Sequence, residues 1–180
     1  MPVNIRTYRN IAPILGARVY VDPAATVIGR VRIGDDSSIW PAAVVRGDVH
    51  SIGIGARTSI QDGSVLHVTH DGPYTPGGRS LNVGSDVTVG HRVTLHACTI
   101  GDRCLVGMGS VVLDGVVTED LVMIGAGCVV PPGRRLETRG LYVGSPARRV
   151  RDLTQAEIDF FTYSAAQYVK LKNEYLGTSI

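Results

Sequence analysis

The stretch that decides the fold is "VGSDVTVGHRVTLHACTIGDRCLVGMGSVV", residues 83–112, in which an aliphatic residue returns about every six positions. Many of these residues are followed by glycine, and a small or β-branched residue mostly stands two positions before them. The spacing continues on both sides of the stretch. The aliphatic positions are Ile33, Ile39, Val45, Ile54, Ile60, Leu66, Val83, Val89, Leu95, Ile100, Val106, Val112, Ile124 and Val130.

This period predicts a parallel β-helix built from six-residue faces. Two inward side chains separated by one outward side chain are typical of a strand, and the restart after six residues requires a turn. Three faces close a coil of about eighteen residues, a triangular prism with sides of about 20 Å whose coils stack about 4.8 Å apart. The hexapeptide pattern resembles the left-handed class of such solenoids. We therefore predict an all-β fold, a left-handed parallel β-helix.

Two segments depart from the period. The register positions Ile54 and Val83 are 29 residues apart, so one coil carries an insertion. It lies within "THDGPYTPGGRS", residues 69–80, whose Gly, Pro and Asp content predicts a protruding loop. After the repeat ends, an α-helix is predicted from about Leu153, because Thr154 and Glu157 form a capping box. The apolar stripe of this helix is Ile158, Phe161, Ala165, Tyr168 and Lys172.

These segments define the predicted domains, and the composition excludes some classes of protein. Residues 1–150 form the β-helix, and residues 151–180 form a C-terminal helix packed on it. A formal net charge of +2 on 180 residues gives no field strong enough to predict a nucleic-acid partner. The chain has no apolar run of the about 20 residues that span a bilayer and no signal-peptide segment, so we expect no membrane partner and a cytoplasmic location.

The register places the histidines of the central stretch in two different positions. His67 follows Leu66 and His96 follows Leu95, so their side chains stack outward in one column of consecutive coils. Arg46 lies in this column one coil lower. Two imidazoles stacked in this way can share a metal, because Zn–N bonds are about 2.0–2.1 Å.

His91 belongs instead to a corner, in a column with Asp62. About one side of the prism, on the order of 16 Å, separates His91 from His96, so the two cannot chelate one ion within a chain. They can do so across a symmetric subunit interface, and three histidines with an open position are the pattern of catalytic zinc. His70, at the start of the insertion, is a candidate for proton transfer, whereas His50 is expected to be a surface residue.

Three segments resemble the γ-class carbonic anhydrases and their bacterial relatives: "VVRGD" (44–48), "SIQDGSVLH" (59–67) and "VGHRVTLHAC" (89–98). The resemblance covers nearly the whole chain. It implies a left-handed β-helix that forms a homotrimer with metal sites between subunits.

The resemblance also implies roles for individual residues. His67, His91 and His96 match the zinc ligands, with His91 donated by a neighbouring subunit. Gln61 matches a glutamine that hydrogen-bonds the metal-bound solvent. The remaining matches are the arginine–aspartate pair Arg46 and Asp48, the acidic residue Asp62, and Tyr163 as a tyrosine brought by the terminal helix. No organic cofactor site is implied.

The expected function is hydration of carbon dioxide to bicarbonate by a zinc-dependent carbonic anhydrase, a lyase with a small-molecule substrate. Iron and cobalt are alternative metals, since both accept three imidazoles. The chain departs from the archaeal members in its insertion, which contains Asp71 and no glutamate, and this bears on proton transfer. Two other functions stay open: a hexapeptide acyltransferase or thioesterase, and a metal-binding trimer without catalysis.

Overall fold

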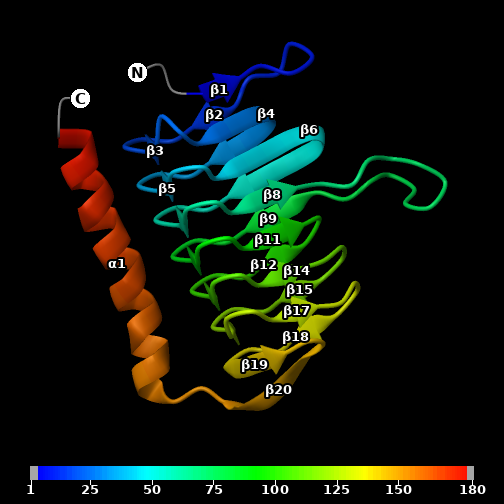
Figure 1. Ribbon diagram of the computed structural model, residues 1–180, viewed down its shortest axis with the longest axis vertical. Helices are drawn as coiled ribbons and strands as arrows, with labels where there is room; N and C mark the ends of the chain where they lie inside the picture. Colours follow the sequence, from blue (N-terminus) through cyan, green and yellow to red (C-terminus); the bar gives the residue numbers. More distant parts are fainter. Residues whose placement is uncertain (1–3, 178–180) are drawn as a thin grey trace.

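The computed structural model describes residues 4–177 of the 180-residue chain. Short strands stack into a long prism, and one helix runs along its outside from the last coil back towards the first (Figure 1). This architecture is the left-handed parallel β-helix with a C-terminal helix that the six-residue register predicts. The coils are parallel to one another except for a closing antiparallel hairpin.

The strands form two sheets that make the three sides of the prism. The larger sheet bends at β6 and covers two sides. Its strands are β1 (Asn4–Arg6), β2 (Ile14–Leu15), β4 (Thr26–Ile33), β6 (Val44–Ile54), β8 (Val65–His67), β9 (Leu81–Val83), β11 (Thr94–His96), β12 (Thr99–Ile100), β14 (Val111–Val112), β15 (Val117–Thr118), β17 (Val129–Val130) and β18 (Arg135–Leu136). The third side consists of β3 (Tyr20–Val21), β5 (Ser38–Ile39), β7 (Ser59–Ile60), β10 (Thr88–Val89), β13 (Leu105–Val106), β16 (Met123–Ile124), β19 (Gly140–Gly144) and β20 (Ala147–Asp152).

The core is the interior of the prism, and it consists of the positions that the period selects. All fourteen aliphatic positions of the period are buried. The small residues two positions earlier are also buried, including the three cysteines, which are unpaired. Burial raises the pKa of the Cys98 thiol to about 12 and that of Cys104 to about 11, so both are thiols at neutral pH. The cysteines therefore act as small core residues.

Close stacking of backbones explains why glycine follows so many aliphatic positions. A Cβ on Gly55 would lie 2.5 Å from the carbonyl carbon of Gly84 on the next coil. Any side chain there would push the coils apart, because strand backbones in a sheet are about 4.8 Å apart.

Coil length varies along the prism. Ile33 pairs with Ile54, 21 residues further on. Ile54 pairs with Val83, so the insertion falls between β8 and β9 as predicted. Val83 pairs with Ile100, which makes the following coil 17 residues long, one fewer than the distance from Val106 to Ile124. The insertion is closed at its base by an antiparallel bridge between Thr69 and Arg79 and projects well away from the prism (Figure 1).

The helix α1 (Gln155–Gly177) packs on the side formed by β3, β5, β7 and β10. Its predicted capping box is present: Thr154 N donates to Glu157 Oε2 at 2.8 Å, and Glu157 N donates to Thr154 Oγ1 at 3.3 Å. Ile158, Phe161 and Lys172 of the predicted stripe are buried. The division of the chain at residue 150 stays a prediction.

Polar contacts in the middle of the helix and towards its C-terminal end hold it against the sheet. Ser164 and Thr88 share a hydrogen bond of 2.8 Å between their hydroxyl groups. Nearer the C-terminal end, the buried Lys172 donates from Nζ to Asp36 Oδ1 at 2.9 Å. Within residues 4–177, no helix is both long and apolar enough to cross a membrane.

Candidate metal centre

The column of two histidines forms as the register predicts. His67 ends β8, His96 ends β11, and the two are directly paired neighbours in the sheet. Their ring centroids are 5.2 Å apart, and His67 Nδ1 lies 3.2 Å from His96 Nε2. Both side chains are partly exposed, because the column faces outward from the prism.

The spacing of these two nitrogens fits a tetrahedral metal. Two ligand nitrogens on tetrahedral zinc, with Zn–N bonds of about 2.0–2.1 Å, lie about 3.3–3.4 Å apart. The observed separation of 3.2 Å is close to that value. The same separation also suits an N–H···N hydrogen bond between the rings in the metal-free protein. The pair can therefore hold either a proton or a metal ion between its inner nitrogens.

A carboxylate lies within hydrogen-bonding distance of the outer nitrogen of each histidine ring, the nitrogen that faces away from the other histidine. His67 Nε2 lies 3.0 Å from Asp48 Oδ1, and His96 Nδ1 lies 2.8 Å from Asp114 Oδ2. A histidine that binds metal through one nitrogen usually donates its other N–H to such an acceptor, which selects the tautomer and orients the ring. The carboxylates thus leave Nδ1 of His67 and Nε2 of His96 free to act as ligands.

The charges around the column favour this arrangement of donors. Burial lowers the pKa of His67, which favours the neutral imidazole that a metal requires. Burial by itself would raise the pKa of Asp48, but hydrogen bonds from His67 and Arg46 outweigh it and hold that pKa below its usual range. The pKa of Asp114 is lowered in the same way: hydrogen bonds from Thr69 and His96 outweigh the opposing effect of burial. Both carboxylates are therefore ionised acceptors at neutral pH.

The corner histidine lies apart from the column, as the register predicts. His91 follows β10 at a turn, and its Nδ1 is 3.0 Å from Asp62 Oδ2. Each of the three predicted ligands therefore has its own carboxylate partner. Within residues 4–177 of one chain, no three His, Cys, Asp or Glu side chains gather closely enough to hold a metal.

Gln61 belongs to the corner and not to the column. It follows β7, is 5% exposed, and lines a groove of about 440 Å³ together with His91 and Tyr168. Tyr163, which the resemblance suggested, is 58% exposed on α1, and its ring lies 6.1 Å from that of Phe160. Tyr168 is the helix tyrosine that shares the groove with the corner residues.

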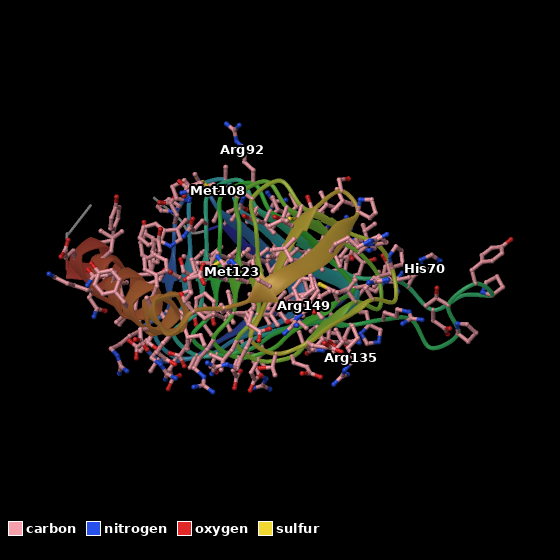
Figure 2. All side chains as sticks on the ribbon, turned by 90° about the horizontal axis from the view of Figure 1, so that it is seen from below. His70, Arg92, Met108, Met123, Arg135 and Arg149 are labelled. Atoms are coloured by element: carbon pink, nitrogen blue, oxygen red, sulfur yellow. The ribbon has the colours of Figure 1, made fainter. Side chains whose placement is uncertain are left out.

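Arg46 and His70 take different places relative to the column. Arg46 forms an ion pair with Asp48 and so contacts the carboxylate that faces His67. His70 is exposed at the root of the insertion. Figure 2, seen from below, shows His70 at the loop, well apart from Arg92 and Met108, which flank the corner of His91.

The residue that the sequence reasoning did not identify is Asp114. It lies 18 residues beyond His96, one position past a full coil, because Leu95 pairs with Val112 at this place. The six-residue register therefore did not point to it directly. The structure thus sorts the predicted residues into two groups. The column holds Arg46, Asp48, His67 and His96, and the corner holds Gln61, Asp62 and His91.

No family model matches the chain, but individual proteins are clearly similar to it. Protein YrdA of Escherichia coli is 57% identical over 172 residues, which cover 96% of this chain and 94% of that protein. The mitochondrial gamma carbonic anhydrase 1 of Arabidopsis thaliana is 42% identical over 92% of this chain, which spans 61% of that longer protein. A solved hexapeptide transferase family protein from Anaplasma phagocytophilum is 35% identical, with a TM-score of 0.89 over 97% of this chain and 99% of that one.

The fold and its register define a hexapeptide-repeat protein of the left-handed β-helix class. Within that class, the chain belongs to the γ-carbonic-anhydrase-like family, which confirms the resemblance that its sequence motifs suggested.

Proposed function

We propose that this chain is a γ-class carbonic anhydrase, a zinc-dependent lyase that hydrates carbon dioxide to bicarbonate. One observation carries the proposal. Two stacked imidazoles, His67 and His96, place their inner nitrogens 3.2 Å apart and have a carboxylate on each outer nitrogen. Similarity to gamma carbonic anhydrases over most of the chain supports it.

The ligand set is completed by a second subunit. His67 and His96 of one chain and His91 of the partner subunit hold the metal in a homotrimer. The separation of column and corner within one chain is the geometry that such a shared site requires. When bound, zinc supplies a Lewis acid that makes water nucleophilic near neutral pH. Iron and cobalt are alternatives, because they accept the same imidazoles.

The other residues of the site orient groups and move protons. Asp62 orients His91, and Asp48, held by Arg46, orients His67. Gln61 comes to the site together with His91, where its amide can hydrogen-bond the reacting solvent.

Two residues outside both groups have proposed roles in proton transfer and in closing the site. His70, which is exposed at the root of the insertion, passes the released proton to bulk buffer. Tyr163 is exposed on α1 and does not line the groove of the corner residues in its own chain, so its proposed role requires that the terminal helix bring it to a site shared between subunits.

The test compares zinc content and carbon dioxide hydration in the wild-type chain and in His91→Ala, with His50→Ala as the control. His50 lies outside both groups, and its Nδ1 accepts from Ser51 N at 2.8 Å. We expect bound zinc and hydration in the wild type and in the control, and loss of both in His91→Ala. Full zinc content in His91→Ala would contradict the ligand assignment.

Acyl transfer is the second candidate, favoured by the similarity to a solved hexapeptide transferase family protein at 35% identity. An acyltransferase or thioesterase would turn over an acyl-coenzyme A after its metal is removed by a chelator. A third possibility, a metal-binding trimer without catalysis, predicts bound zinc, no hydration, and a loss of trimer stability on chelation.

A further inference from the structure

Asp114 connects a predicted metal ligand to the root of the insertion. Its Oδ2 accepts from His96 Nδ1 at 2.8 Å, and its Oδ1 accepts a hydrogen bond from Thr69 Oγ1. Thr69 begins the insertion and is tied by two backbone hydrogen bonds, of 2.9 and 3.1 Å, to Arg79 at the other end. A continuous chain of contacts therefore runs from the closed base of the insertion to the imidazole of His96.

The contact at His96 determines which nitrogen can bind a metal. An ionised carboxylate accepts only, so the proton of a neutral His96 ring lies on Nδ1 and the lone pair lies on Nε2. That lone pair is on the nitrogen that faces His67. Without Asp114, either nitrogen of His96 can carry the proton, and the ring can turn about its side-chain bonds.

Asp114 differs from the other two carboxylates in its partners. Asp48 shares its charge with Arg46, and the Asp62 side chain is half exposed. In the described part of the chain, Asp114 forms no ion pair with lysine or arginine, and its side-chain partners are Thr69 and His96. Its negative charge is therefore directed at the histidine and at a cation bound to that histidine.

We propose that Asp114 is the positioning residue for the metal ligand His96, and that Thr69 holds Asp114 so that the base of the insertion sets the metal affinity of the site. The inference rests on the proposed function, because it takes His96 as a ligand. The insertion, which contains no glutamate, would in this way still contribute to the site by holding a metal ligand in position.

The test uses Co²⁺ as the probe and compares the wild type with Asp114→Asn and Thr69→Val. Asp120→Asn is the matched control, since Asp120 is another carboxylate on a coil turn, where it accepts from Asp102 N at 2.9 Å. Loss of an acceptor behind a metal-binding histidine weakens metal binding by about 10–100-fold. We expect a loss of this size in Asp114→Asn, a smaller loss in Thr69→Val, and wild-type affinity in the control.

A second measurement is independent of metal. In the metal-free protein, at a pH where the ¹⁵N shifts themselves show neutral rings, ¹⁵N NMR of the imidazoles should show the Nδ1–H form of His96 in the wild type. Asp114→Asn should show a mixture of tautomers, and the control should match the wild type. A role in stability alone would not change the tautomer.

The outcomes separate this inference from the proposed function. A folded Asp114→Asn that binds Co²⁺ as tightly as the wild type, with an unchanged tautomer, overturns the inference. A wild-type chain that binds no Co²⁺ overturns the proposed function, and the tautomer measurement then still decides whether Asp114 positions His96. If Asp114→Asn fails to fold, Thr69→Val decides by the same two readouts.

Discussion

Two variants that each lose the metal should regain it when their subunits are mixed. His67→Ala removes half of the column pair, whereas His91→Ala removes the corner ligand. Column and corner are held apart within one chain, so a site between subunits takes its column from one chain and its corner from the next. A mixed trimer has an intact site wherever a His91→Ala chain supplies the column and a His67→Ala chain supplies the corner.

The expected recovery follows from this division. In random assembly of equal amounts, about three quarters of the trimers contain both variants, and each of these has one intact interface out of three. About one quarter of all sites should therefore be restored, and isolated mixed trimers should bind about one zinc ion each. Each variant alone should bind almost none.

The assay is refolding of the two variants together, each with a different peptide tag that has no affinity for metal. Sequential purification on both tags isolates the mixed trimers, and elemental analysis gives zinc per trimer. His67→Ala mixed with wild-type chains provides the reference for full assembly. Mixed trimers, verified by both tags, that contain no more zinc than the separate variants would refute the shared site.

Three further predictions concern stability and are read from urea unfolding. Hydrogen bonds from Arg18, against the opposing effect of burial, help to lower the pKa of Asp36 from 3.8 to about 2. Its stabilising charge is therefore present above pH 4 and is lost as the pH falls towards 2. The free energy of unfolding that Asp36→Asn loses relative to the wild type should be smaller at about pH 3 than at about pH 6. An equal loss at the two pH values would contradict this. Phe161 is 1% exposed, so Phe161→Ala should lower the free energy of unfolding by about 3–5 kcal/mol. Phe160 is half exposed, and Phe160→Ala should lower it much less. Equal losses would contradict the packing of α1. Gly55→Ala should lower the free energy of unfolding by about 1–3 kcal/mol or more, because its Cβ would collide with the next coil. Wild-type stability would show that the coils are not packed this closely.

The sequence by itself determined the fold and the positions of the three histidines. In a β-helix every coil repeats the geometry of the one before, so a position in the six-residue period is also a position on the prism. For that reason the spacing of His67 and His96 could be read as a column, and that of His91 and Asp62 as a corner. The helix could be read as well, because its capping box and apolar stripe are local signals.

Only the tertiary structure decided which side chains surround the histidines. The period says which residues point outward, but outward side chains are free to turn, and their partners depend on packing that does not repeat. Asp114 faces His96 from the next coil, and its other oxygen is taken by Thr69 at the insertion, whose length the period does not specify. Likewise, the rotation of α1 against the sheet places Tyr168, and not Tyr163, beside the corner residues. Repetition makes the scaffold readable from sequence, whereas the surroundings of the site arise where repetition is broken.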